Sequence, residues 1–136
     1  MADVLLDTGA WFAILDADDR DHSRCVGALR EVAGRLVSSE AVLTETMWLV
    51  AGLRNGPRRC GDFVRRGIVS LIPMSGESLA RAVGLMAQHR SLPMDFADAT
   101  LVSLGEDLGV DRVFTLDRRG FHVYRLHGRR PFQVIP

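Results

Sequence analysis

Short apolar runs alternate with amphipathic stretches along most of the chain. The runs end in polar or glycine residues, which is typical of buried strands, and the amphipathic stretches repeat their apolar positions at helical spacing. Strands are predicted at 4–6, 36–38, 68–72 and 113–116, and helices at 22–32, 40–53, 58–66, 77–86 and 95–108. Strands that alternate with helices predict an α/β protein with a mostly parallel sheet and helices on both of its faces.

Two segments near the carboxyl end, 123–124 and 132–134, are expected to add edge strands and give a sheet of four to five strands. The acidic segment 16–21 is too polar for the core and is expected to form an exposed loop. With 136 residues, 47% of them hydrophobic, the chain is long enough for one core and too short for two. A single domain spanning 1–136 is therefore predicted.

The overall composition excludes several classes of function. The formal net charge is +0, so nucleic-acid binding would have to come from local patches rather than from an overall basic field. All 17 basic residues are arginines, which excludes chemistry that requires a lysine. Cys25 and Cys60 lack the paired spacing of a zinc site and are expected to be idle thiols in a reducing compartment. Without a signal-type segment or a run of membrane-spanning length, a cytoplasmic protein with no membrane contact is predicted.

Carboxylates interrupt four stretches that are otherwise apolar enough to be buried. They are Asp7 at the end of the first strand, Glu45 and Asp98 within predicted helices, and Asp117 after the fourth strand. Asp95 lies one helical turn before Asp98 and can share its face. Buried carboxylates need compensating cations, and a divalent ion such as Mg²⁺ prefers oxygen ligands. Because ligands gather at the carboxyl ends of strands in open α/β sheets, the acids are expected to converge around Asp7.

Each acid also has a purely structural interpretation. Asp7 and Asp117 stand where a strand meets a helix or loop, so each could cap a helix. Asp98 could pair with a core-facing arginine, and Asp95 could be a first-turn acid favoured by the helix dipole. Taken together, two strand-end acids and two helix acids in an α/β chain are what a carboxylate metal site requires.

The same segments carry a resemblance to a known family. In order along the chain, it rests on Leu5-Leu6-Asp7-Thr8-Gly9-Ala10, Leu43-Thr44-Glu45-Thr46, Met94-Asp95-Phe96-Ala97-Asp98-Ala99 and Phe114-Thr115-Leu116-Asp117-Arg118-Arg119-Gly120-Phe121. The sequence resembles the PIN-domain family, and within it the VapC-like ribonuclease toxins of type II toxin–antitoxin pairs. The resemblance implies a three-layer α/β sandwich and an endoribonuclease that depends on Mg²⁺ or Mn²⁺.

The resemblance also implies roles for individual residues. The family's metal-binding set is matched by Asp7, Glu45, Asp98 and Asp117, its neighbouring hydroxyl positions by Thr8 and Thr115, and a position acidic in only part of the family by Asp95. In this hypothesis one or two divalent ions activate a water molecule for in-line attack on an RNA phosphodiester. The resemblance further implies homodimerisation and a small antitoxin whose carboxy-terminal segment occludes the site.

Two surface features would serve these partners. RNA needs cations at the rim of an acidic site, and the candidates are Arg118, Arg119, Arg129 and Arg130. A helical antitoxin segment needs an apolar groove. The candidates for such a groove are Trp48, Leu49 and Leu53, together with Phe12 and Leu15.

Two other functions compete with a nuclease. A phosphotransfer or phosphatase domain would use Asp7 as its nucleophile, but such enzymes normally bring a lysine to the phosphoryl group and this chain has none. A non-catalytic module that binds RNA or protein would have no reason to keep costly carboxylates. Metal titration separates these alternatives, because a binding module would act without Mg²⁺.

Overall fold

Five short strands form one parallel sheet at the centre of the molecule, of which the computed structural model describes residues 2–136. The strands are β1 (Val4–Leu6), β2 (Leu36–Ser38), β3 (Val69–Leu71), β4 (Arg112–Phe114) and β7 (Gln133–Ile135). Their spatial order is β3-β2-β1-β4-β7, and every neighbouring pair is parallel. The predicted parallel sheet is confirmed.

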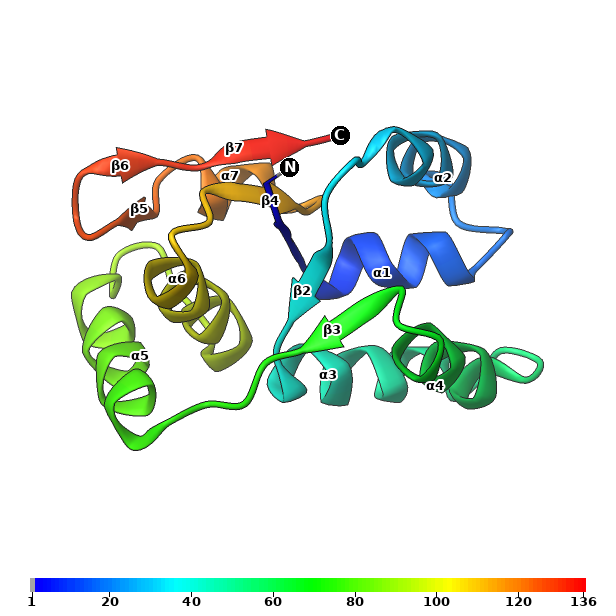
Figure 1. The fold of residues 1–136 in the computed structure, drawn as a ribbon, viewed down its shortest axis with the longest axis horizontal. Helices are drawn as coiled ribbons and strands as arrows, with labels where there is room; N and C mark the ends of the chain where they lie inside the picture. The colour runs from blue at the N-terminus through cyan, green and yellow to red at the C-terminus, as the bar shows by residue number, and fades with distance from the viewer. Residues whose placement is uncertain (1) are drawn as a thin grey trace.

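Helices cover the sheet on both sides. They are α1 (Thr8–Leu15), α2 (His22–Glu31), α3 (Glu40–Val50), α4 (Gly56–Arg65), α5 (Gly76–Gln88), α6 (Phe96–Leu108) and α7 (Arg118–Phe121). Figure 1 shows α5 and α6 packed together on one side of the sheet, and α1, α3 and α4 grouped on the other. Among the helices of residues 2–136, none is long and apolar enough to cross a membrane.

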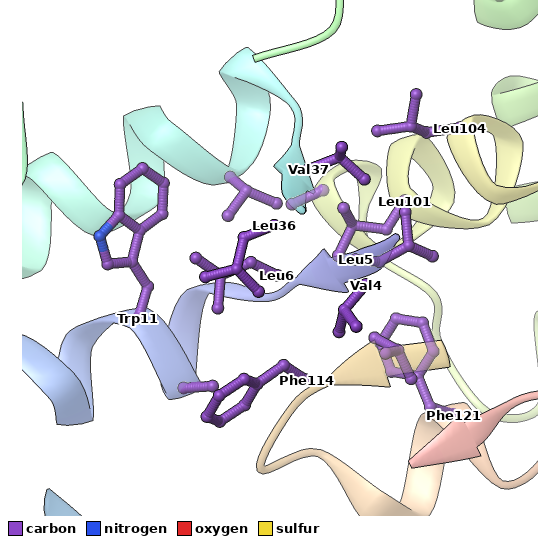
Figure 2. Close-up of a cluster of buried hydrophobic side chains, with 14 of the residues drawn as sticks. Val4, Leu5, Leu6, Trp11, Leu36, Val37, Leu101, Leu104, Phe114 and Phe121 are labelled. Carbon is purple, nitrogen blue, oxygen red and sulfur yellow. The ribbon is translucent and has the colours of Figure 1, made fainter. Parts of the chain in front are cut away.

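The core is built around β1, whose three residues are completely buried. Figure 2 shows side chains of β1, β2, β4, α1 and α6 gathered around this strand. A strand covered on both faces has no solvent side, which explains why Val4, Leu5 and Leu6 form a continuous apolar run rather than an alternating one. Cys25 and Cys60 are both buried and unbridged, as expected.

The strand order places a topological switch point beside β1. From β1 the chain builds outward to β2 and β3 on one side, whereas β4 and β7 extend the sheet on the other. Asp7 directly follows β1, and Asp117 follows β4 after two residues. Both acids therefore lie at the edge of the sheet where parallel α/β proteins bind their ligands.

The segment after α7 differs from the sequence prediction. Val123 and Tyr124 form a turn rather than a strand, and the residues that follow form a short antiparallel hairpin of β5 (Arg125–Leu126) and β6 (Arg130–Pro131). Tyr124 is buried, so its apolar character reflects packing and not strand pairing. The other predicted edge strand is present as β7, which pairs with β4.

The α3–α4 boundary also falls earlier than predicted. The α3 helix ends at Val50, three residues before the predicted end, and α4 begins at Gly56. A Cβ on Gly56 would lie 1.9 Å from the carbonyl oxygen of Val50, so the close approach of the two helices requires glycine.

Candidate active site

Asp7 is the most enclosed of the predicted acids, at 7% exposed. Its Oδ1 accepts a hydrogen bond of 2.8 Å from the backbone N–H of Thr8, and its Oδ2 accepts one of 2.6 Å from the hydroxyl of Thr115. Both carboxylate oxygens of Asp7 are therefore held in place, Oδ1 by the first residue of α1 and Oδ2 by the residue that follows β4. Each oxygen keeps a further lone pair for another ligand.

Thr115 connects Asp7 to Asp117. The Thr115 side chain is fully buried, and its hydroxyl donates to Asp7 while it accepts a 2.9 Å bond from the backbone N–H of Asp117. Asp117 is exposed and caps α7, because its Oδ1 accepts from the N–H of Gly120 at 3.0 Å. The capping interpretation of Asp117 is confirmed, and the cap holds the carboxylate beside Asp7.

Glu45 reaches the same place from α3. Its Oε1 accepts a 2.7 Å hydrogen bond from the hydroxyl of Thr8, the residue that also binds Asp7 through its backbone. The two residues are 37 positions apart in the chain, and they meet because α1 packs on α3. Thr8 therefore joins Glu45 to Asp7 as Thr115 joins Asp117 to Asp7.

Asp95 and Asp98 approach from the start of α6. Asp95 is the N-cap of this helix, and its Oδ1 accepts from the backbone N–H of Asp98 at 2.8 Å. The alternative in which Asp98 pairs with an arginine is not observed within residues 2–136. The Oδ2 of Asp98 instead lies 3.3 Å from the hydroxyl of Tyr124, which donates to it.

The acids raise one another's pKa values, which shows that their carboxyl groups are close in space. Burial raises the pKa of Asp7 from 3.8 to about 6, with the charges of Asp117 and Asp95 adding to the increase and the bonds from Thr115 and Thr8 opposing it. Burial also raises the pKa of Asp98 from 3.8 to about 8, followed by the charges of Asp7, Asp95 and Asp117. Four acids from β1, α6 and the β4–α7 junction thus share one negatively charged region.

The carboxylate oxygens of these acids are ligands of the type that a divalent cation prefers. None of these acids forms an ion pair with an arginine or histidine within residues 2–136, so no side chain of this range neutralises their mutual repulsion. Across the same residues, no three His, Cys, Asp or Glu side chains are grouped so that they could hold one metal ion. Oxygen-only donors with room for water suit Mg²⁺, which usually takes one or two carboxylates and keeps several waters.

The comparison with protein families bears on the same segments. The PIN domain family matches residues 4–126, which include every acid described above. The chain belongs to the PIN domain family.

Known PIN-fold proteins extend the comparison. The chain is 29% identical to Ribonuclease VapC26 of Mycobacterium tuberculosis over 136 residues, which is 98% of this chain and 100% of that protein. Its fold is similar to that of VapC20 of Mycobacterium tuberculosis, a sarcin–ricin loop cleaving toxin, with a TM-score of 0.79 and 19% identity over 94% of this chain and 99% of that one. VapBC2 from Rickettsia felis, bound to a DNA fragment from its promoter, gives a TM-score of 0.71 and 12% identity over 98% and 99% of the chains. At these identities the solved structures establish the fold.

The four arginines predicted to bind RNA beside the acids of this PIN domain do not all lie free at the site. Arg118 donates to the carbonyl oxygen of Pro136 at 2.6 Å, and Arg130 pairs with Asp111 at 2.9 Å. The β5–β6 hairpin, which carries Arg129 and Arg130, is held to Glu106, about 12 Å along α6 from Asp98 at 1.5 Å per residue. Arg119 is exposed, two residues beyond Asp117, and its side chain makes no hydrogen bond or ion pair within the described chain.

The predicted apolar groove exists in a different form. A hollow of about 470 Å³ is lined by Thr8, Thr44, Glu45, Trp48 and Leu49. Trp48 is 78% exposed, whereas Leu15 is buried in the core, and Leu15, Phe12 and Leu53 do not line the hollow. Thr8 and Glu45 line the hollow and also belong to the acidic site, so the hollow opens directly beside the acids.

Two residues at the site were absent from the sequence prediction. Tyr124 binds Asp98, and Gly120 binds Asp117. The sequence assigned Tyr124 to a strand, and no spacing rule links it to an acid 26 positions earlier. The glycine three residues after Asp117 was a usable signal, because an aspartate cap accepts from the N–H of the third residue of its helix.

Proposed function

We propose that this PIN domain is a metal-dependent endoribonuclease and the toxin of a toxin–antitoxin pair. The proposal is carried by the cluster of acids at the carboxyl edge of the sheet, which has no cationic partner within residues 2–136. Similarity to a relative named as a ribonuclease, over nearly the full length of both chains, supports this function. The chemistry would be hydrolysis of an RNA phosphodiester bond.

The ion would be Mg²⁺, with Mn²⁺ as the alternative. Asp7 and Asp98 would be its principal ligands, and Asp117 and Glu45 would bind it directly or through water. A bound divalent ion lowers the pKa of a water molecule, orients the phosphate and stabilises the leaving oxygen. Burial and then the neighbouring acids raise the pKa values of Asp7 and Asp98, and a bound cation would offset both effects and keep the two carboxylates ionised.

The protein's own residues would prepare the site for this ion. Thr115 and the N–H of Thr8 fix the two oxygens of Asp7, so the free lone pairs keep one direction. The hydroxyl of Thr8 holds Glu45, and Asp95 orients the first turn of α6, from which Asp98 projects. Arg119 would bind the phosphate backbone of the RNA, with Arg118, Arg129 and Arg130 as outlying contacts.

The hollow at Trp48 and Leu49 is the proposed docking site for an antitoxin. It is apolar along α3 and acidic where Glu45 lies, which suits an amphipathic segment that carries both an apolar and a basic side chain. Such a segment would cover the acids and prevent RNA from reaching them. Fold similarity to VapBC2 is consistent with this partner. Homodimerisation stays a prediction from the family.

The first experiment is cleavage of total RNA by the purified protein, with the new ends mapped. We expect cleavage in Mg²⁺ or Mn²⁺ and none in EDTA. Asp7→Asn should reduce the rate at least about 100-fold, since even an outer-shell partner of a metal ligand is typically worth 10–100-fold. Its fold should persist, because asparagine accepts the same backbone N–H at a helix cap.

Asp18→Asn is the matched control, because Asp18 is an exposed acid in the loop between α1 and α2. This variant should cleave as the wild type does. Full activity in EDTA, or full activity of Asp7→Asn at saturating Mg²⁺, would refute the proposed function.

A further inference from the structure

The segment that follows β4 touches two acids of the site through residues that are not themselves acidic. The backbone N–H of Gly120 donates to Oδ1 of Asp117 at 3.0 Å, and the hydroxyl of Tyr124 donates to Oδ2 of Asp98 at 3.3 Å. Asp117 belongs to this segment, whereas Asp98 belongs to α6, 26 positions earlier than Tyr124. The segment from Asp117 to Tyr124 therefore contacts two of the proposed metal-binding carboxylates, its own Asp117 and Asp98 of α6.

The Tyr124 ring has little freedom to move. The residue is 1% exposed, and its ring meets His89 and Phe121 edge to face, with centroid distances of 5.1 Å and 5.2 Å. A buried phenol needs a hydrogen-bond partner, and the only one that it has within residues 2–136 is Asp98. The hydroxyl is thus aimed at this carboxylate by packing on both sides of the ring.

The backbone that carries Tyr124 is braced as well. The carbonyl of Gly120 accepts from the N–H groups of both Val123 and Tyr124, at 2.9 Å and 3.0 Å. The guanidinium of Arg125 donates to the carbonyls of His122, Val123 and Tyr124, at 2.7 Å, 3.1 Å and 3.1 Å. These bonds fix a turn that has no strand or long helix to support it.

A side chain at position 120 would crowd the side chains of Asp117 and Tyr124. A Cβ there would lie 2.6 Å from Oδ2 of Asp117, 3.0 Å from the Tyr124 hydroxyl oxygen and 3.1 Å from the Tyr124 ring. A side chain at this position would therefore push against both contacts of the turn at once. Asp117, Gly120 and Tyr124 are packed closely enough that a larger residue at position 120 would displace the side chain of Asp117, of Tyr124 or of both.

We propose that Tyr124 is a positioning residue of the metal site, which holds Asp98 in its ligand orientation while Gly120 holds Asp117. The inference rests on the proposed function, because it concerns the cation that the acids would bind. Groups that hydrogen-bond to metal ligands fix their orientation, and their removal typically weakens metal affinity or activity 10–100-fold. Tyr124 itself touches neither ion nor substrate.

The test is direct binding of Mn²⁺ to the full-length protein, measured by the loss of the free-ion signal in electron paramagnetic resonance. Tyr124→Phe removes the hydroxyl and keeps the ring in its packing. We expect about a 10-fold or larger increase in the Mn²⁺ dissociation constant, with a melting temperature in EDTA close to that of the wild type. Gly120→Ala should weaken Mn²⁺ binding in the same direction.

Phe132→Leu is the control for a merely structural effect. Phe132 packs edge to face on Phe121 and not on Tyr124, so its truncation should lower the melting temperature and leave Mn²⁺ affinity unchanged. Equal Mn²⁺ affinity in Tyr124→Phe and the wild type overturns the inference and leaves the proposed function standing. A wild-type protein that binds no Mn²⁺ overturns both.

Discussion

Asp7, Asp95 and Asp117 each accept a backbone N–H at the start of a helix. The sequence offered capping as the alternative to metal binding for Asp7 and Asp117, and a first-turn position for Asp95. All three are N-caps, so Asp95 lies just before the first turn in which it was expected. The two roles are compatible, because the positive end of a helix dipole makes it less costly to hold a carboxylate near other carboxylates. Asparagine retains the capping oxygen, so Asp→Asn variants remove the charge and keep the local structure.

The buried acids predict how the metal-free protein responds to pH. The folded-state pKa values of Asp7 and Asp98 are about 6 and about 8, both raised from 3.8. Between about pH 4 and these values the folded state binds more protons than the unfolded state, so stability falls as pH rises through this window. For Asp7 the shift of roughly two units corresponds to about 3 kcal/mol at most. Melting temperatures in EDTA should therefore fall more from pH 5 to pH 8 in the wild type than in Asp98→Asn.

Only the difference between the two proteins is informative, because Asp7 loses its proton in the same pH range in both of them. Asp107 has a lowered pKa from its bonds to Ser78 and Arg81, which outweigh its partial burial, and it stabilises the fold at higher pH instead. Asp18→Asn should follow the wild-type curve. Identical pH dependence in the wild type and Asp98→Asn would contradict the assignment of Asp98 as a destabilising charge.

At the scale of elements, the packing of α6 on β1 sets where Asp98 lies relative to Asp7. Gly105 lies where α6 is tightly packed, since a Cβ there would be 2.7 Å from the Val110 carbonyl oxygen, 3.1 Å from the Leu126 side chain and 3.2 Å from the Leu5 side chain in β1. Gly105→Ala should destabilise the protein by about 1–3 kcal/mol, the usual cost of overpacking a core. Urea denaturation measures this change.

Gly84, on the neighbouring helix α5, has open space where Gly105 is tightly packed. It lies inside α5, where a Cβ would meet nothing within 4 Å, so Gly84→Ala should stabilise the protein by about 0.5–1 kcal/mol through helix propensity alone. The two glycine substitutions should therefore have opposite signs. A neutral or stabilising Gly105→Ala would show that α6 can move away from β1 without cost.

The elements themselves were predictable to different degrees. The central strands and long helices follow from apolar runs and helical periodicity, because complete burial of β1 and the amphipathic faces of the helices leave a direct trace in the sequence. The turn at 122–124 was assigned wrongly, because a buried aromatic residue looks the same in a strand and in a packed turn. The β5–β6 hairpin was missed for a different reason, because its strands of two residues each are too short to show any periodicity.

The whole molecule has a formal net charge of +0, so attraction to RNA must arise locally. Arg119 is exposed and lies two residues after Asp117 in the chain. If it contacts a phosphate, Arg119→Gln should reduce the slope of log affinity against log salt by about 0.7, the value for one contact on a single strand. Binding of single-stranded RNA to the Asp7→Asn variant, which should not cleave it, measures this slope.

Arg20 provides the matched control. Its side chain is 94% exposed and it lies beyond the far end of α1 from Asp7, so Arg20→Gln should leave the slope unchanged. An unchanged slope in Arg119→Gln would place the phosphate contacts elsewhere on the surface.

The sequence by itself determined the α/β class, the parallel sheet and the identity of the acids. These follow from local pattern, because a buried strand must be apolar and a carboxylate inside an apolar segment stands out at once. Only the tertiary structure decided that Thr8 and Thr115 bridge the acids, that Tyr124 is the partner of Asp98, and that the hollow forms at Trp48 without Leu15. Such contacts join residues up to 108 positions apart, and the packing of whole elements sets them, so they leave no periodic trace in the chain.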